Sequence, residues 1–453
     1  MMGPKKEAQA ALFYEFDLDR HVPFDHVLRQ IDRFVDLSGI RSLLAPYYSA
    51  TGRPSIDPEL MIRMLLVGYC MGIRSERRLC EEVHLNLAYR WFCRLDLNDA
   101  VPDHSTFSKN RHGRFRESDL FRRLFDAVLT RCIAEGLVGG DDFGVDASLI
   151  KADASRYTKV DMADWSVPDR VSRATQEYLD TLDDAAFGGA TPVQPKSVSP
   201  ADPAARYTGA NGDRPFFAYS TNYLVDLDNA IIVDVDATAP IRQAEVEIAK
   251  EMILRTRERF GLYPEKLVAD TAYGSAPMLG WLVEDEGIEP YIPVIDKSQR
   301  SDGTFSRDDF AYDQDSDNYT CPADKQLVQF RRTYKRPRSG VDKEGLMRYR
   351  ASKKDCDVCP LKQQCCPNEP ARKILRSVHE GARQMARDIT KTDAYVTASY
   401  ARKKVEMLFA HLKRIMRLDR LRLRGPNGAR DEFTLAATVQ NLRKLAKLVP
   451  SPA

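Results

Sequence analysis

Two aspartates stand in stretches that otherwise have the pattern of apolar strands. Asp146 lies within the stretch 143–150, and Asp270 ends the stretch 267–270. Aspartate is depleted in strands, and a single one is most simply a cap or turn residue at a strand end. Two of them on strands of one α/β sheet favour a functional site, because ligands in open α/β sheets bind outside the carboxyl ends of strands.

A third carboxylate, Glu406, lies in a predicted helix from about Tyr395 to Leu418. Successive residues of a helix are rotated by about 100°, which places six apolar residues on one side of this helix. They form the predicted buried stripe: Val405, Leu408, Phe409, Leu412, Ile415 and Met416. The predicted solvent side carries Lys403, Lys404, His411 and Arg414. Four cations lie within about 40° of the Glu406 direction: Arg402, Lys413, Arg417 and Arg420. A ladder of Glu-to-Lys/Arg pairs would contribute about a few tenths of a kcal/mol per pair. The excess of cations suits a polyanion better.

This combination of carboxylates and cations is typical of phosphodiester chemistry. Two Mg²⁺ ions held by carboxylates can activate an attacking oxygen and stabilise the leaving oxygen of a phosphodiester. Hard oxygen ligands favour Mg²⁺ or Mn²⁺. The residue types therefore predict that Asp146, Asp270 and Glu406 bind Mg²⁺ or Mn²⁺, while the neighbouring Arg and Lys side chains hold DNA phosphates.

The predicted secondary structure that positions these residues changes along the chain, from helices alone to alternating strands and helices. Helical patterns fill residues 57–139, and strands then alternate with helices up to about residue 294. This alternation predicts an α/β sheet. Residues 188–215 are rich in Pro, Gly, Ala and Ser, which predicts a long surface loop. Between about 296 and 373 the sequence shows no regular helix or strand pattern, which indicates an insertion. A final helix is predicted over 431–448.

Composition excludes several classes of protein. The 453 residues include 68 Lys and Arg against 66 Asp and Glu, and 43% are hydrophobic, as in ordinary globular proteins. The longest apolar stretch, Leu60 to Ile73, contains Arg63 and falls short of the roughly 20 residues that span a bilayer. No apolar segment of a secretory signal follows the charged N-terminus, so we expect a cytoplasmic protein without membrane segments.

Cysteines cluster in the predicted insertion. Cys356-x-x-Cys359 is followed by Cys365 and Cys366, and Cys321 lies upstream. Structural Zn²⁺ takes four tetrahedral ligands, so the set Cys321, Cys356, Cys359 and Cys365, or Cys366 in place of Cys365, predicts a zinc site. Free thiols in a loop remain the plainer alternative, and an iron–sulfur cluster is less favoured. The cysteines of the helical segments are expected to be small hydrophobic residues.

A strongly basic segment runs from Phe330 to Lys354. It carries ten Lys and Arg residues against Asp342 and Glu344, with Tyr334 and Tyr349 interleaved. A solvated run of charge and a contact with the DNA backbone are equally compatible with this composition.

Taken together, these motifs resemble the DDE transposases of bacterial insertion sequences, in the group that includes the IS-five and IS-eleven-eighty-two types. The catalytic motifs of that family match Val145-Asp146, Asp270-Thr271-Ala272-Tyr273 and Tyr400-x-Arg402-x-x-x-Glu406-x-x-x-x-x-x-Lys413. Its other motifs match Arg53-Pro54, Gly72-Ile73-Arg74-Ser75-Glu76-Arg77, Pro102-Asp103-His104-Ser105-Thr106 and Tyr319-x-Cys321-Pro322. The resemblance covers most of the chain, from about Asp57 to Leu448.

The resemblance implies a fold of the α/β class, with a ribonuclease H-like catalytic core. It divides the chain into an N-terminal all-helical, DNA-binding domain (1–140), a first part of the core (141–295), a cysteine-containing insertion (296–373) and a C-terminal part of the core (374–453). Asp146, Asp270 and Glu406 would be the catalytic metal ligands. The DNA contacts would come from Tyr400, Arg402, Lys413, Arg417 and Tyr273.

The implied reaction is water attack at the end of the element to free a 3′-OH, followed by attack of that 3′-OH on target DNA. The implied partner is double-stranded DNA with terminal inverted repeats, held by a homodimer. Two alternatives stay open. One is a transposase remnant that binds the repeats without catalysis, and the other is a metal-dependent nuclease, which uses the same kind of metal site.

Overall fold

The computed structural model describes residues 16–49, 51, 55–187, 195–209, 214–296, 298–329 and 340–450. These residues form two compact units. The first comprises the described residues within Met1–Gly140, Gly144–Tyr263 and Lys403–Ala453, and the second comprises those within Asp141–Phe143 and Pro264–Arg402. Arg53-Pro54 and the most basic part of the charged segment, with Tyr334, lie outside the described residues.

Nine α-helices and a 3₁₀ helix (Ala45–Tyr47) form the described N-terminal part of the first unit. The α-helices are α1 (Leu18–His21), α2 (Val27–Asp32), α3 (Ile40–Leu44), α4 (Pro58–Cys70), α5 (Glu76–Leu85), α6 (Leu87–Phe92), α7 (Ser105–His112), α8 (Arg114–Glu117) and α9 (Leu120–Ala134). Asp57 caps α4 by accepting from the Glu59 N–H, and Pro58 occupies the first helical position. The predicted helical character of this segment is therefore confirmed.

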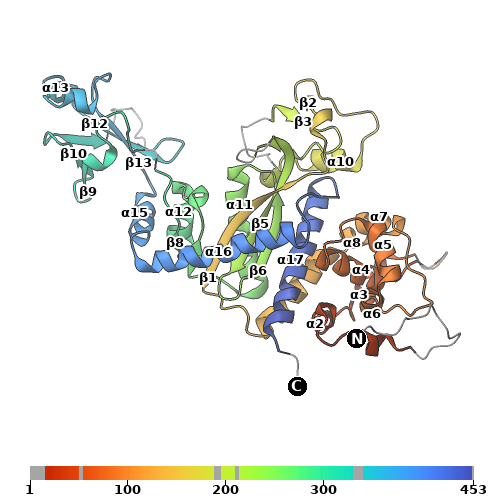
Figure 1. The fold of residues 1–453 in the computed structure, drawn as a ribbon. Helices are drawn as coiled ribbons and strands as arrows, with labels where there is room; N and C mark the ends of the chain where they lie inside the picture. Colours follow the sequence, from red (N-terminus) through yellow and green to blue (C-terminus); the bar gives the residue numbers. More distant parts are fainter. Residues whose placement is uncertain are drawn as a thin grey trace, which may run out of the picture. The chain divides into compact units, whose positions relative to one another are not determined.

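The first unit also contains most of a β-sheet. Its strands are β1 (Asp142–Lys151), β4 (Arg206–Thr208), β5 (Phe216–Asp226) and β6 (Ile231–Thr238), and β5 lies between β4 and β1 in the strand order. β5 pairs antiparallel with β6 from Ser220↔Thr238 to Asp226↔Ile231, so the two strands form a hairpin. Every residue of β6 is buried. Two helices, α11 (Arg242–Phe260) and α17 (Pro426–Leu448), pack against β6 (Figure 1).

The predicted surface loop over 188–215 is only partly correct. Residues 195–209 contain β4 and the short strand β3 (Ser197–Val198), which pairs with β2 (Val160–Asp161). Asp202 is completely buried and accepts a hydrogen bond of 2.7 Å from the Tyr219 hydroxyl on β5. This buried contact fastens the segment to the sheet, and a pattern rich in small residues could not reveal it. Residues 188–194 and 210–213 lie outside the described residues.

The second unit begins with residues 141–143, at the start of β1. The Lys266 N–H donates to the Asp141 carbonyl (3.1 Å), and β7 (Lys266–Val268) pairs in parallel with β8 (Glu289–Tyr291). α12 (Ala276–Gly280), continued by a π-helical turn over Trp281–Asp285, lies between these two strands in the chain. α12 and β8 pack against α15 (Glu380–Ile389). The predicted strand–helix–strand order is confirmed here.

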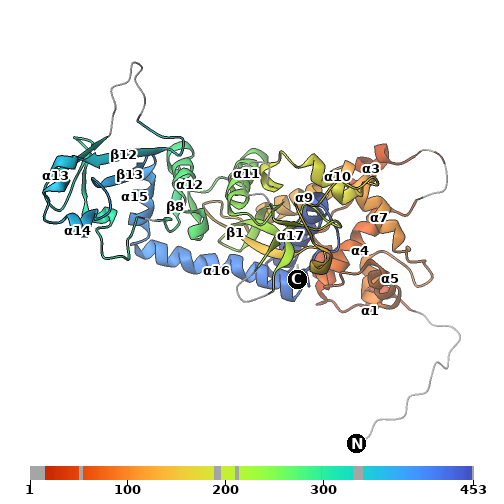
Figure 2. The same ribbon diagram turned by 90° about the horizontal axis from the view of Figure 1, so that it is seen from above.

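The predicted insertion contains a five-stranded antiparallel sheet. In chain order its strands are β9 (Ala311–Asp313), β10 (Asn318–Thr320), β11 (Gln326–Gln329), β12 (Leu346–Ala351) and β13 (Lys373–Ser377). β13 pairs with β12 and continues past residue 373, so the sheet extends beyond the predicted end of the insertion. Its own core consists of Phe310, Tyr319, Leu327, Tyr349, Ala351 and Ile374. Figure 2 shows α13 (Lys353–Asp357) and α14 (Lys362–Cys365) beside this sheet. Strands of three to six residues are too short for a clear alternation, so the sequence pattern missed them.

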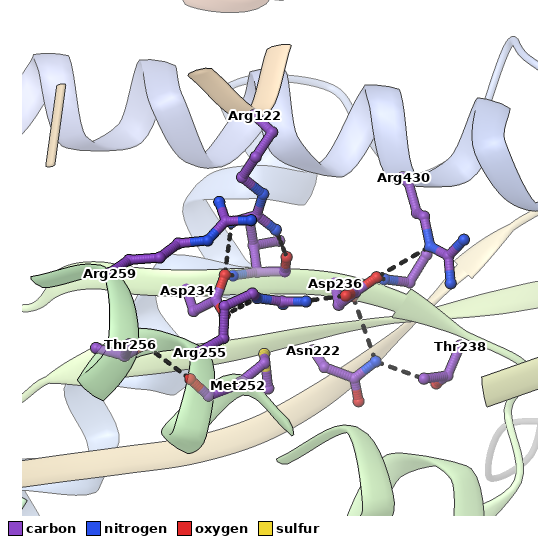
Figure 3. Close-up of polar contacts among 12 residues, drawn as sticks. Arg122, Asn222, Asp234, Asp236, Thr238, Met252, Arg255, Thr256, Arg259 and Arg430 are labelled. Atoms are coloured by element: carbon purple, nitrogen blue, oxygen red, sulfur yellow. Dashed lines mark hydrogen bonds and ion pairs between the residues drawn. The ribbon is translucent and has the colours of Figure 1, made fainter. Parts of the chain in front are cut away.

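Charged side chains connect three helices of the first unit to β6. Asp234, which is almost fully buried, accepts from Arg122 of α9 (2.6 Å) and Arg255 of α11 (2.7 Å). Asp236 accepts from Arg255 (3.0 Å) and Arg430 of α17 (3.2 Å), as Figure 3 shows. Burial alone would raise the pKa of Asp236, but Arg430, Arg255 and Arg122 outweigh it and lower the pKa below its ordinary value.

We predict that Asp234→Ala lowers the free energy of unfolding by roughly 3–5 kcal/mol, because it leaves the buried Arg122 guanidinium without its carboxylate and removes one of the two carboxylates that pair with Arg255. Chemical denaturation of the full chain measures this change. Asp169→Ala is the control, because Asp169 is exposed, and its effect should stay within about 0.5 kcal/mol. Equal losses in both variants would show that the network does not hold the helices to β6.

Candidate functional site

The helix α16 (Asp393–Arg414) packs along one face of β1 in the first unit. At one end of this contact, a Cβ atom added to Gly144 would lie 3.0 Å from Val405 Cγ2 and 2.9 Å from Leu227 Cδ2. At the other end, the Lys413 ammonium donates to Ser148 Oγ over 2.8 Å. Alternate residues of a strand share a face, so Asp146 lies on this same face, between Gly144 and Ser148.

Glu406 belongs to the side of α16 that faces β1. Glu406 and Lys413 are seven residues apart, which is about 20° around the helix and about 10.5 Å along it. Val405, the residue before Glu406, contacts Gly144, and Lys413 contacts Ser148. Asp146 and Glu406 are both solvent-accessible, since Asp146 is half-buried and Glu406 is exposed. The packing of α16 on β1 thus brings two of the three predicted carboxylates onto facing elements.

Buried contacts fix the position of this part of α16. The Phe409 ring stacks on the Tyr223 ring of β5, with 4.8 Å between centroids and 22° between planes. Gln440 of α17 accepts from the Tyr223 hydroxyl (2.9 Å) and donates to the Leu408 carbonyl (2.8 Å). Lys404, predicted on the solvent side, is exposed, but its ammonium donates to the Leu227 carbonyl (2.5 Å). The helix therefore has little freedom to slide along β1.

Two details of the predicted helix are wrong. α16 ends at Arg414, so Ile415 lies outside the helix and is 51% exposed, although the helical period placed it in the buried stripe. His411 was predicted on the solvent side, but it is half-buried with Nδ1 3.4 Å from Gln440 Nε2. Burial lowers the pKa of His411, and Arg443 and Lys444 lower it further.

Asp270 belongs to the second unit. β7 ends at Val268, so Asp270 follows the carboxyl end of that strand by two residues. One of its carboxylate oxygens accepts from the Ala272 N–H (2.8 Å) and caps the 3₁₀ turn Thr271–Tyr273. The plain expectation of a cap at a strand end is thus confirmed. The residue remains exposed, so this cap leaves the carboxylate accessible to solvent.

The predicted DNA-contact residues differ in exposure. Tyr400 is 63% exposed on α16, Arg417 is exposed, and Arg402 and Lys413 are half-buried. Burial lowers the pKa of Lys413, and the nearby Lys151 lowers it further. Tyr273 is only 2% exposed, so its ring packs in the interior. That burial does not fit the contact with DNA that the sequence predicted for Tyr273.

The sequence motifs did not single out Gly144 and Ser148, the two residues at the ends of the contact between β1 and α16. Both lie two residues from Asp146, so the alternation of strand faces was the signal that could have identified them. Gly144 lets the helix approach the strand closely, and Ser148 accepts from Lys413.

Five cysteines of the second unit line one small cavity of about 20 Å³: Cys321, Cys356, Cys359, Cys365 and Cys366. Such a volume holds about one water molecule. The Lys325 N–H donates to Cys321 Sγ over 3.3 Å, which is the kind of backbone contact that orients a thiolate ligand. All nine cysteines are free thiols. Of the helical cysteines, Cys70, Cys93 and Cys132 are buried as expected, and Cys80 is half-buried.

Among the described residues, no three His, Cys, Asp or Glu side chains stand together in an arrangement that could hold a metal ion. The donor types nevertheless fit two different ions. Carboxylate oxygens at Asp146 and Glu406 suit Mg²⁺ or Mn²⁺, and thiols around one cavity suit Zn²⁺.

No curated protein matches this chain. The chain is similar to the cryo-EM structure of the piggyBac transposase synaptic complex with hairpin DNA, at 10% identity over 93% of this chain and 72% of that one. The TM-score of 0.32 is too low for that likeness to support any conclusion. None of the described helices is long and apolar enough to cross a membrane.

Two protein families match separate parts of the chain. Residues 16–113 match the family described as "Transposase domain (DUF772)". Residues 320–446, which include α16, match the family described as "Transposase DDE domain". The first match covers most of the N-terminal helices, and the second covers the helix that carries Glu406 and Lys413. Together the two matches support a DDE-type transposase.

Proposed function

We propose that this chain is the transposase of a bacterial insertion sequence, which cuts DNA at terminal inverted repeats and joins the freed ends to target DNA. The observation that carries the proposal is the packing of α16 on the face of β1 that contains Asp146. The two transposase family matches support it independently. The fold proposed for the catalytic part is ribonuclease H-like.

In this proposal Asp146, Asp270 and Glu406 hold Mg²⁺ or Mn²⁺. When bound, a pair of such ions would activate the attacking oxygen and stabilise the leaving oxygen of the phosphodiester. The carboxylates of Asp146 and Glu406 are accessible from solvent on facing elements, which supports their roles. Asp270 keeps an exposed carboxylate while capping its own turn.

The cations of α16 and the residues after it would bind the DNA phosphates next to the cut. Lys413 is the best supported, because Ser148 fixes its ammonium on the face of β1 that carries Asp146. The exposed ring of Tyr400 and the guanidinium groups of Arg402 and Arg417 would contact the end of the element. The N-terminal helices would read the repeats, and a homodimer in the cytoplasm would hold two element ends.

A nuclease without strand transfer and a catalytically inactive DNA-binding protein are the competing functions. Both share the N-terminal helices and the basic residues with a transposase. They differ from it in what happens to DNA, since a nuclease nicks without joining and an inactive binder does neither. Products of a reaction with two DNA molecules therefore separate the three functions.

We also propose that four cysteines of the second unit bind one structural Zn²⁺. Cys321, Cys356 and Cys359 would supply three ligands, and Cys365 or Cys366 the fourth. The cavity that the five cysteines line adjoins the small core of the five-stranded sheet, against which Cys321, Cys356 and Cys365 pack. A metal there would connect α13 and α14 to that sheet.

We predict that Asp146→Asn and Glu406→Gln each abolish cleavage at the element end while leaving the affinity for terminal-repeat DNA largely unchanged. The reason is that each variant removes a negative ligand without removing a phosphate contact. Gel assays of nicking and of binding, with Mg²⁺, measure the two effects separately. Asp169→Asn is the matched control and should cut normally. Normal cleavage by either active-site variant would refute the metal assignment.

We predict that the full chain contains about one zinc per molecule and that Cys356→Ala together with Cys359→Ala removes it and destabilises the second unit. Elemental analysis measures zinc, and visible absorbance of the Co²⁺-substituted protein reports thiolate ligation. Cys80→Ala, outside the cluster, should keep the zinc. Single Cys365→Ser and Cys366→Ser variants identify the fourth ligand. Wild-type protein without zinc, and without Co²⁺ absorbance, would refute this site.

A further inference from the structure

A cavity of about 210 Å³ lies at the N-terminus of α5 in the first unit. Its charged and hydroxyl-bearing lining residues are Tyr69, Arg74, Ser75, Glu76, Arg111, Arg422 and Glu432, and the Arg74 guanidinium lies 4.0 Å from the centroid of the Tyr69 ring. Arg74, Ser75 and Glu76 belong to the segment 72–77 that the sequence singled out, and α17 contributes Glu432. The proposed catalytic chemistry uses none of these residues.

Two arginines that line this cavity are buried, and each has one N–H group without a hydrogen-bond acceptor among the described residues. The side chains of Arg74 and Arg111 are only 8% and 6% exposed. Arg74 pairs with Glu432 through Nη2, and Arg111 pairs with Glu76 through Nη1 (2.7 Å). The Nε atom of each arginine is buried and has no hydrogen-bond partner in the described part of the chain. Buried N–H groups of this kind are rare, because leaving them unpaired is unfavourable.

The carboxylates of the cavity already have donors. Glu432 Oε1 accepts from the backbone N–H groups of Arg422 (2.6 Å) and Leu423 (2.7 Å), and Oε2 pairs with Arg74. Glu76 pairs with Arg111. The lining therefore contains three arginines against two carboxylates, both of which are paired.

The N-terminus of α5 adds to the positive character of the cavity. α5 spans ten residues, and Ser75 is its N-cap. The exposed N–H groups and the dipole at a helix N-terminus favour anions. Guanidinium groups bind phosphate oxygens through several N–H donors at once.

We propose that this cavity binds a phosphate group, with Arg111 and Arg74 as the principal donors. The phosphate could belong to the backbone of bound DNA or to a free phosphate ion, and both present the same oxygens to the cavity. The binding site does not depend on catalysis, because none of its residues belongs to the proposed metal site. Phosphate binding can therefore be tested even if the chain does not cut DNA.

The first test is isothermal titration of the full-length chain with inorganic phosphate. Arg111→Gln should weaken binding at least tenfold, since it removes one of the two buried donors. Arg78→Gln is the matched control, because Arg78 lies on the same helix but pairs at the surface with Glu82 (3.2 Å). Because Arg111→Gln leaves Glu76 without its partner, Arg111→Gln with Glu76→Gln is measured beside it, and thermal melting checks that each variant is folded.

A second titration identifies the source of the phosphate. Binding of a short DNA duplex of arbitrary sequence is measured at several salt concentrations. If DNA supplies the phosphate, Arg111→Gln reduces the slope of the logarithm of the DNA-binding constant against the logarithm of the salt concentration by about one. Arg78→Gln leaves this slope unchanged, and inorganic phosphate competes with the duplex for binding. If free phosphate is the ligand, Arg111→Gln loses phosphate binding with the slope unchanged. The proposal is overturned if Arg111→Gln changes neither measurement, or if Arg78→Gln has the same effect.

Discussion

The packing of α16 on β1 is the constraint on which the proposed site depends. A helix can lie against a strand in many registers, but two contacts at known positions allow only one here. Gly144 gives room for Val405, and Ser148 accepts the Lys413 ammonium, so the helix is fixed at both ends of the contact. This register determines where Glu406 lies relative to Asp146. A shift of one helical turn would move Glu406 by about 5.4 Å along β1.

Buried charge holds the N-terminal helices to the rest of the first unit. Arg122 connects α9 to Asp234 of β6, and Arg74 pairs with Glu432 of α17. Gly72 (φ +68°) lies close to the end of α16, where a Cβ would come within 2.7 Å of the Ile415 carbonyl oxygen. A side chain at this position would therefore disturb both the backbone conformation and the contact. These interactions join elements that are distant in the sequence. A substitution among the N-terminal helices, such as one at Gly72, can therefore alter the position of the segment that follows Lys413.

Local patterns predicted much of the fold. β1 and α16 have clear periods of two and 3.6 residues, and both are found where the sequence predicts them, although α16 ends earlier, at Arg414. The five-stranded sheet of the second unit was missed, because its strands are short and their pairing depends on distant partners. The burial of Asp202 and of Tyr273 could not be read either, since each depends on packing between segments. The catalytic roles of Asp146, Asp270 and Glu406 stay predictions.

The most direct test of the central claim is a cleavage and strand-transfer assay with Mg²⁺ on DNA that carries the element's own ends, comparing wild type with Asp270→Ala. Asp270 is the decisive residue, because its proposed role as a metal ligand rests on the sequence motif, while in the structure its exposed carboxylate caps only its own turn. We expect the wild type to nick the end and join it to a second DNA, while the variant binds the DNA but does neither. Wild-type binding without nicking, nicking without joining, or normal activity of the variant would contradict it.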